Sequence, residues 1–430
     1  MKIIEPDRRR VPRLKTIESP DITLPSPVRL DNGIELYDIR GGANEIINLS
    51  FYFKGSAAFY NSLTLAGFTV DTLLKGSAEY NMETISNIID YYGIDMDCDL
   101  DRDRISISIT LLKKHLDKFM PFLEDIIKNA SFPEEEIDLY LKNTKQSFII
   151  KQQKTAYICK TKFREKLFGV EHPYGNNVRI EDFSIYNNKE FKEFHNNNFT
   201  YNNCYIVISG YTDDKLIKLI NVHFGQNNWS NNFKAANTIK NTLSDSDKKS
   251  FLLKPDAIQS AIRIGRIVCN HKHPDYIGLS CLKTILGGYF GSRLMTNIRE
   301  HKGYTYGINA ILHPFCHSAS LIISTQTGNK YTKKVVNEIY KEIKRLQEKK
   351  VSASELNLVK NYTIGNYLRS VGNPISKAKV LSLIKEFQLE NDYFIKYLDE
   401  YKKLTGERIQ EMAVKYLNPD EMFEMIVGNN

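Results

Sequence analysis

The spacing of apolar and polar residues changes along the chain, and it predicts which segments are strands and which are helices. Residues 47–53, Ile-Asn-Leu-Ser-Phe-Tyr-Phe, alternate in a way that is typical of a half-buried strand. Residues 333–348 repeat an apolar residue every three or four positions, as an amphipathic helix does. The Asn-Gly pair within residues 30–36 predicts a hairpin. Further helices are predicted over 64–76, 82–92, 113–128 and 275–286, and further strands over 104–109, 205–210, 262–268 and 422–428.

Landmarks of the first half of the chain recur in the second half at a nearly constant distance. Gly93 and Gly303, which both end predicted helices, are 210 residues apart. The segments 131–134 (Ser-Phe-Pro-Glu) and 352–355 (Ser-Ala-Ser-Glu) each have the form of a helix capping box, and they are 221 residues apart. Strands that end in glycine recur 218 residues apart, at Gly210 and Gly428. These distances indicate that a unit of roughly two hundred residues has been duplicated.

The order of predicted elements places each unit in the α+β class, with a mainly antiparallel sheet and helices packed on one face. Residues 1–27 contain several prolines among charged residues and are predicted to form an extended arm. Residues 28–223 are the first predicted domain and 251–430 the second. Between them, residues 224–250 are rich in Asn, Ser and Lys, which is typical of a linker.

Composition narrows the class of protein. The chain has 430 residues, of which 42% are hydrophobic and 26% charged, as in a globular protein. Its net charge of +8 is spread along the sequence, so no nucleic-acid partner is expected. The six cysteines form no dense framework, no apolar run is long enough to cross a bilayer, and the N-terminus does not resemble a signal peptide. We therefore expect a cytoplasmic protein without a membrane partner.

The main candidate functional residues lie in the segment between residues 287 and 306. Gly287-Gly288 is followed by a predicted helix over 292–301, and Gly303 is expected to end that helix. Arg299 in its last turn and Tyr306 at the start of the next strand can then point into one cleft. A guanidinium and a phenol are both hydrogen-bond donors that suit a carbonyl oxygen gaining negative charge. The alternative is an ordinary surface arginine beside a core tyrosine.

This block resembles the C-terminal half of the pitrilysin/insulinase family of zinc peptidases, which includes mitochondrial processing peptidase. In that family a Gly-Gly and Ser-Arg-Leu segment precedes an Arg and a Tyr seven residues apart, and the two hold the substrate backbone beside the scissile bond. The resemblance implies that role for Arg299 and Tyr306. It covers nearly the whole chain and implies two similar domains that face each other across a cleft.

The same resemblance implies that the predicted helix 64–76 corresponds to the zinc-binding helix of the family. Active family members carry His-x-x-Glu-His on this helix, with two zinc ligands and the residue that polarises water. The flanking Leu-Lys-Gly-Ser sets the register, so Gly67, Val70 and Asp71 stand at those positions, and Ser147 stands where a third ligand, Glu, is expected. Catalytic zinc needs about three protein ligands, and one carboxylate cannot hold it. No cofactor is expected in this chain.

Other histidines and a cysteine lie close together in sequence, at His313, Cys316 and His317, with His271 and His273 not far away. Side chains on a strand and turn alternate between faces. A metal shared among these residues is therefore not expected.

Members of the family that work in pairs place the zinc helix in one subunit and the Arg/Tyr pair in the other. The resemblance therefore implies a non-catalytic subunit of a heterodimeric zinc endopeptidase. Its partner would be a homologous chain with His-x-x-Glu-His and zinc, and its substrate a peptide. The alternative is a purely structural subunit like the core proteins of the respiratory bc complex. A self-sufficient hydrolase would need a different catalytic pattern, and none is present.

Overall fold

The computed structural model describes residues 24–55, 63–230, 233 and 247–429. Most of the predicted arm (1–27) and much of the predicted linker (224–250) lie outside the described residues. Among the described residues, no helix is both long and apolar enough to cross a membrane. Phe224 and Trp229, at the start of the range assigned to the linker, are buried in the core of the first half.

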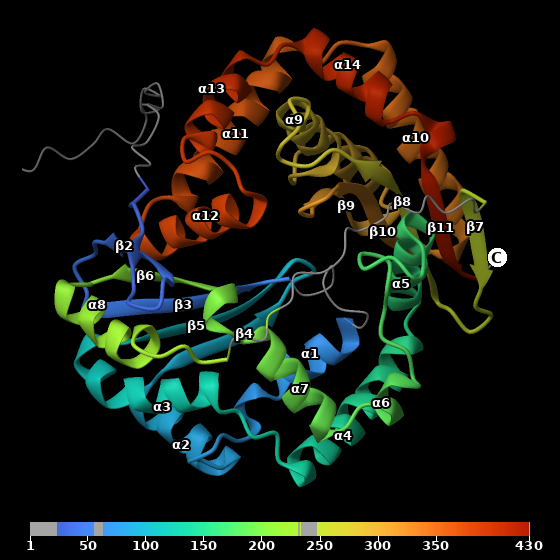
Figure 1. Cartoon of the computed structure of the whole chain (residues 1–430). Coiled ribbons are helices and arrows are strands. Elements are labelled where there is room, and N and C mark those ends of the chain that lie inside the picture. Colours follow the sequence, from blue (N-terminus) through green and yellow to red (C-terminus); the bar gives the residue numbers. More distant parts are fainter. Residues whose placement is uncertain (1–23, 56–62, 231–232, 234–246, 430) are drawn as a thin grey trace, which may run out of the picture.

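Two sheets organise the chain, and their strand orders correspond except that the first sheet has one additional edge strand, β1 (Figure 1). The first has the order β1-β2-β6-β3-β5-β4, and the second has the order β7-β11-β8-β10-β9. In each sheet one pair of strands is parallel, β2 with β6 and β11 with β7, and the remaining pairs are antiparallel. This correspondence confirms the predicted α+β architecture of two similar units. The strands are β1 (Val28–Arg29), β2 (Glu35–Arg40), β3 (Ile46–Lys54), β4 (Asp95–Leu100), β5 (Arg104–Leu112), β6 (Cys204–Gly210), β7 (Lys249–Leu253), β8 (Gln259–Val268), β9 (Thr305–Pro314), β10 (Ala319–Gly328) and β11 (Phe423–Gly428).

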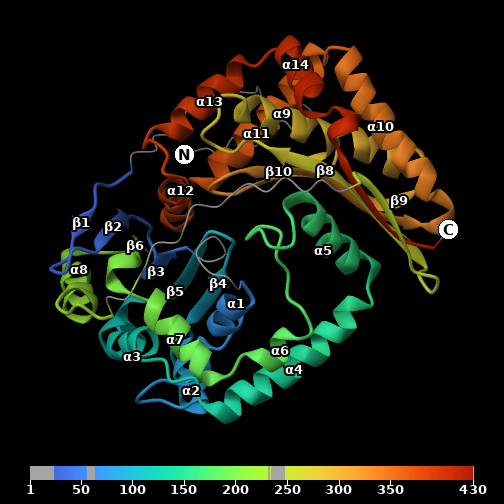
Figure 2. The same ribbon diagram turned by 45° about the vertical axis from the view of Figure 1, so that its right-hand side comes forward.

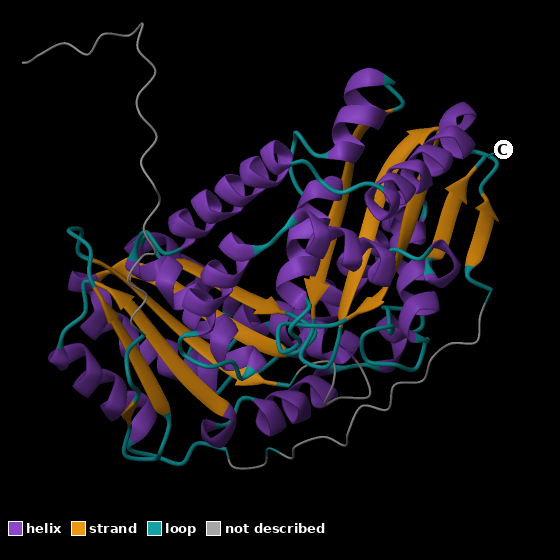
Figure 3. Ribbon diagram, turned by 90° about the horizontal axis from the view of Figure 1, so that it is seen from above, coloured by secondary structure: helices purple, strands orange, loops and turns teal. Residues whose placement is uncertain are grey.

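Helices pack around the two sheets, as the view from above also shows (Figure 3). In the first half they are α1 (Leu63–Asp71), α2 (Met82–Tyr92), α3 (Leu116–Lys128), α4 (Glu134–Gln152), α5 (Thr155–Phe168), α6 (Asp182–Ile185), α7 (Asn188–Asn198) and α8 (Asp214–Ile220). In the second half they are α9 (Tyr276–Gly287), α10 (Thr332–Glu348), α11 (Ala353–Ser370), α12 (Pro374–Phe387), α13 (Tyr393–Lys403) and α14 (Gly406–Tyr416).

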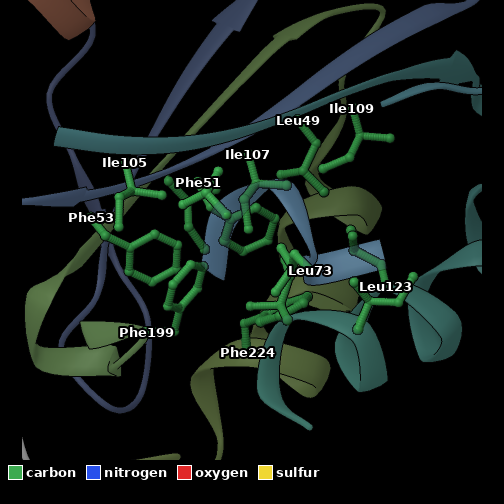
Figure 4. Packing of buried hydrophobic residues seen from close by; sticks show 14 of the residues in the cluster. Leu49, Phe51, Phe53, Leu73, Ile105, Ile107, Ile109, Leu123, Phe199 and Phe224 are labelled. Carbon is green, nitrogen blue, oxygen red and sulfur yellow. The ribbon is translucent and has the colours of Figure 1, made fainter. Parts of the chain in front are cut away.

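The core of the first half lies between its sheet and its own helices (Figure 4). Leu49, Phe51 and Phe53 point from β3 into this core and are completely or almost completely buried. Phe53 packs on Phe199, with the ring centroids 4.8 Å apart. Burial of one such side chain stabilises the folded state by about 1.5–3 kcal/mol.

Part of the other face of each sheet is covered by a helix from the opposite half. Helix α5 packs on β8 and β11 of the second sheet (Figure 2). Its Cys159 and Phe163 join Val427 of β11 in a buried cluster. Helix α12 packs on β2 and β6 of the first sheet, with Ala378 and Leu381 in its apolar contact. The two halves therefore exchange one helix each, and the duplicated units are not separate globules.

Because of this exchange, the burial of β3 differs from the prediction. Residues 47–53 were expected to be buried on one face only, but every one of them is buried. Tyr52, on the face away from the first core, packs in the cluster that includes Ala378 and Leu381 of α12. The expectation of a half-buried strand was wrong because the covering helix lies more than three hundred residues away in sequence.

Of the helix ends predicted from the sequence, the two glycine ends form as expected and the first capping box does not. Gly93 and Gly303 both adopt left-handed backbone conformations, with φ of 60° and 63°, as expected at helix ends. The predicted capping box at 131–134 does not form. Phe132 is buried with φ of 49°, and α4 starts after Pro133 without a side-chain cap. The backbone N–H of Ser131 instead donates to the carbonyl of Gly76, which holds this segment to the end of the 3₁₀ turn Leu73–Lys75.

The capping box at 352–355 forms in part. The hydroxyl of Ser352 accepts a hydrogen bond from the backbone N–H of Glu355 at 3.2 Å. The carboxylate of Glu355 does not return to the cap, because it forms two hydrogen bonds of 2.9 Å with Arg293. Gly287, the last residue of α9, packs closely against β9. A Cβ there would lie 2.6 Å from the backbone nitrogen of Ala310 in β9.

Candidate functional site

Helix α1, which the sequence predicts to correspond to the zinc helix of the family, lies against the edge strand β4 (Figure 1). It is shorter than the predicted helix over 64–76, since it ends at Asp71 and a separate 3₁₀ turn follows. Val70 is 2% exposed and belongs to the apolar core. Gly67 has no side chain, and a Cβ there would meet Leu100 of β4 at 3.6 Å. Neither position offers an atom that could bind a metal ion.

Asp71 is exposed at the end of α1, and it accepts a hydrogen bond of 2.7 Å from the hydroxyl of Tyr140 on α4. Burial and the charge of Asp71 raise the pKa of Tyr140, so this hydroxyl stays protonated and acts as a donor. Ser147 lies on the same helix and is exposed. Of the four positions, only Asp71 carries a carboxylate, and catalytic zinc needs about three protein ligands.

Arg299 belongs to a π-helical segment, Met295–His301. The predicted helix over 292–301 therefore has wider last turns, in which Lys302 donates to the carbonyl of Asn297, five residues earlier. Such segments often occur at functional sites. The guanidinium of Arg299 lies 4.8 Å from the ring centre of Phe290, and Nη1 lies 2.5 Å from the carboxylate of Glu300.

Tyr306 is the second residue of β9 and is 91% exposed. Its hydroxyl is therefore available to another molecule. No hydrogen bond joins Tyr306 to Arg299 among the residues that the structure describes. Their joint action on a substrate stays a prediction, and the exposure of Tyr306 rules out the alternative of a core tyrosine.

A cavity of about 650 Å³ lies between the two halves. One wall comes from the first sheet, and the opposite wall includes His313, Ile375 and Lys379 of the second half. Four carboxylates line the first wall, at Asp95, Asp97, Asp99 and Asp101.

The row follows from strand geometry, because every second residue of β4 points to the same side. Met96, Cys98 and Leu100 point the other way and pack against the first core. The neighbouring strands add polar side chains to the same wall, and Asn48 donates to the hydroxyls of Ser108 and Thr110. This acidic row was not predicted, although the alternation Asp-Met-Asp-Cys-Asp-Leu is visible in the sequence. The row lowers the local potential and favours positively charged ligands.

Another group of potential metal ligands lies apart from α1. Asp103, Cys316 and Glu386 each bring one ligand atom within 4.8 Å of the others. Burial raises the pKa of both carboxyl groups, that of Glu386 to about 7. Cys316 had been considered together with His313 and His317, but the structure places its sulfur beside two carboxylates from other parts of the chain.

Two protein-family profiles match the chain. Residues 64–167 match the sequence profile of insulinase, peptidase family M16, and residues 186–363 match the profile described as the peptidase M16 inactive domain. The chain therefore belongs to peptidase family M16, the family that its Arg/Tyr block and α1 resemble.

Individual relatives are distant in sequence but cover most of the chain. A Helicobacter pylori protein named non-peptidase homolog YmxG is 23% identical over 381 residues, which is 86% of this chain and 84% of that protein. An uncharacterised zinc protease of Rickettsia bellii is 20% identical over 85% of this chain and 81% of its own length.

Solved structures show the same fold. The peptidase M16 inactive domain from Pseudomonas fluorescens superimposes with a TM-score of 0.84 at 18% identity, over 95% of this chain and 98% of that one. A protease from Helicobacter pylori superimposes with a TM-score of 0.85 at 16% identity, over 94% of this chain and 100% of that one.

Proposed function

We propose that this chain is a non-catalytic subunit of a heterodimeric zinc endopeptidase. The observation that carries the proposal is that α1 lacks a set of metal ligands. Gly67 and Val70 stand where a zinc ligand and the catalytic Glu are expected, and Asp71 accepts a hydrogen bond from Tyr140. One related profile is described as an inactive domain, and one relative is named a non-peptidase homolog. Both descriptions support a chain that does not hydrolyse peptides by itself.

The proposed contribution of this chain is substrate binding and transition-state stabilisation. Zinc in the partner would supply the nucleophilic water, and Tyr306 and Arg299 would donate to the substrate carbonyl as its oxygen becomes negative. Tyr306 is exposed enough to reach a second chain. Arg299 would first have to leave Glu300, an exchange of one exposed ion pair that costs little. The cavity between the halves would hold the peptide.

One observation favours the alternative, a purely structural subunit. Arg299 already forms an ion pair with Glu300 and stacks on Phe290, so interactions within the chain satisfy its charge. A structural subunit would need nothing more from this arginine. We favour the catalytic partnership because Tyr306 has no packing role that would explain a tyrosine at this position. A cytoplasmic location is part of the same proposal.

Co-expression tests the partnership. A homologous chain with an intact His-x-x-Glu-His motif, taken from the same genome, is expected to co-elute with this chain in size-exclusion chromatography. The interface should bury more than about 1,000 Å². The complex should cleave peptides, whereas each chain alone and a complex whose partner has Ala for the first His should not. Separate elution at micromolar concentrations would contradict the heterodimer, and a stable but inactive wild-type complex would support the structural alternative.

A further inference from the structure

Three side chains from distant segments meet where the two halves join. Asp103 lies in the turn between β4 and β5, Cys316 in the turn between β9 and β10, and Glu386 near the end of α12. Their ligand atoms all lie within 4.8 Å of one another. We propose that these three residues bind a divalent cation that accepts sulfur as well as oxygen, with zinc as the best fit. This site is separate from α1 and from the Arg299 block.

The two carboxylates are already held in place by neighbouring donors. Asp103 accepts from the hydroxyl of Tyr174 at 2.7 Å and from the backbone N–H of Cys316 at 2.8 Å. Nη1 of Arg104 lies 2.8 Å from Oε2 of Glu386. Each carboxylate oxygen has two lone pairs, so these contacts leave capacity for a metal. Ligands in metal sites are usually oriented by such outer partners.

An unpartnered donor nearby provides independent support. The group borders a cavity of about 240 Å³ that is also lined by Tyr205 and Arg104. Tyr205 is 6% exposed, and its hydroxyl has no hydrogen-bond partner. Nε of Arg104 is buried and unpartnered as well. A buried donor without an acceptor costs about 1–3 kcal/mol. A water molecule that completes the coordination of a metal would supply the missing acceptor.

Charge and ligand chemistry select the kind of ion. The thiol would lose its proton to solvent when a metal–sulfur bond forms, which gives one thiolate and two carboxylates. A divalent cation and the adjacent Arg104 together balance these three negative charges. Calcium and magnesium prefer oxygen ligands only, whereas zinc binds sulfur and oxygen in a tetrahedral set. Zinc–ligand distances of about 2.0–2.3 Å place ligand atoms about 3.5 Å apart, so small side-chain rotations would close the group.

A metal here would link the two halves directly. Asp103 comes from the first half, and the other two ligands come from the second half. The cation would therefore resist separation of the halves beside the cavity, and the stabilisation of the fold would grow with the logarithm of its free concentration.

Metal binding to the isolated full chain tests the proposal. After dialysis, elemental analysis is expected to find one zinc per wild-type chain, and added zinc should raise the melting temperature of metal-stripped protein. Cys316→Ser and Glu386→Gln should each lose the bound zinc and the thermal shift. The matched control Cys98→Ser, at another half-buried cysteine, should keep both.

Cobalt substitution keeps the test independent of how the variants fold. Cobalt bound to wild-type protein should give a thiolate-to-metal charge-transfer band in the near ultraviolet, and this band should be absent from Cys316→Ser. A wild-type chain that binds no zinc or cobalt overturns the proposal. It is also overturned by bound cobalt without a thiolate band, or by zinc that a folded Cys316→Ser variant retains.

Discussion

The hydroxyl of Tyr140 donates a hydrogen bond of 2.7 Å to Oδ2 of Asp71. This contact joins α4 to the end of α1, at the position that the sequence predicts to correspond to a zinc ligand of active family members. Asp71 therefore has a hydrogen-bond partner from the protein itself, and Gly67 one turn earlier has no ligand atom. If the register expected from the sequence holds, this hydrogen bond occupies the place of a metal–ligand bond.

The first prediction is that α1 binds no catalytic zinc. In a Cys316→Ser background, which removes the other proposed site, Asp71→Ala should change neither the metal content nor the absence of peptidase activity, because one carboxylate is too few ligands. Elemental analysis and a chelator-sensitive peptidase assay on the isolated chain measure both. Zinc that disappears together with the Asp71 carboxylate would show that α1 is a metal site.

The second prediction concerns the proposed donors to the transition state. In the assembled heterodimer, Tyr306→Phe and Arg299→Ala should each lower kcat by about 10²–10³, which corresponds to about 3–4 kcal/mol. Arg299→Ala should also raise KM more, since a guanidinium can bind a substrate carbonyl before the reaction. Steady-state kinetics of the complex provide the measurement.

The matched control for this pair is Tyr91→Phe, another exposed tyrosine, on α2. It should leave the kinetics unchanged. Zinc content and assembly should stay constant in all three variants, because the metal would be in the partner chain. The melting temperature of Tyr306→Phe should also stay constant, because Tyr306 buries little surface. A folded double variant with full activity would eliminate the catalytic role.

The third prediction is that the acidic row selects basic peptides. Replacement of two carboxylates by Asp97→Asn and Asp99→Asn should weaken binding of a Lys/Arg-rich peptide by about 2–30-fold, on the basis of about 0.2–1 kcal/mol for each exposed charge pair. Binding to the wild type should weaken as salt is added, and less so for the variant. Fluorescence anisotropy with a labelled peptide is suitable.

The control variant for the acidic row is Asp117→Asn, which removes an exposed carboxylate from α3. If it weakens binding as much as the double variant does, then net charge and not the row determines the affinity. A neutral peptide of equal length should be insensitive to either change.

The fourth prediction concerns the exchanged helix α5. Phe163 is almost completely buried against the second sheet, so Phe163→Ala should destabilise the protein by about 3–5 kcal/mol. The loss should appear as faster proteolysis of the second half, although Phe163 belongs to the first half in sequence. Val414→Ala, at an exposed position of α14, should cost less than about 0.5 kcal/mol. Equal protection of the second half in Phe163→Ala would contradict the proposed dependence.

The fifth prediction is a pH effect at His195. Burial lowers its pKa from 6.5 to about 4, and Nε2 lies 3.0 Å from the carbonyl of Ile127. The unfolded chain therefore takes up this proton more readily, and stability should fall as the pH drops from about 6.5 toward 4. The shift corresponds to about 3 kcal/mol at the acidic end.

Urea unfolding at several pH values measures this dependence. His195→Gln should be less stable at pH 7, because the ring stacks on Phe199, but its stability should change less between pH 6.5 and 4. An identical pH slope in variant and wild type would show that other groups cause the acid sensitivity.

Local patterns in the sequence predicted much of the secondary structure. The helix predicted over 82–92 is α2 with the same bounds, and the strand over 205–210 differs from β6 by one residue. Such elements depend on periodicity and on terminal residues such as Gly93, which are properties of neighbouring residues. The repeated landmarks also predicted the duplication, because both units need the same turns. The family resemblance rested on short motifs of the same local kind.

Tertiary structure decided what covers each apolar face and which side chains meet. The segment 131–134 has the sequence of a capping box, but burial of Phe132 and the contact of Ser131 with Gly76 prevent it from forming. The exchange of α5 and α12 is invisible in local periodicity, since an apolar face does not specify its partner. Asp103 and Cys316 are likewise brought together only by the packing of the two halves. Contacts between distant segments depend on the shape of the whole fold, and a single sequence does not encode them in any local pattern.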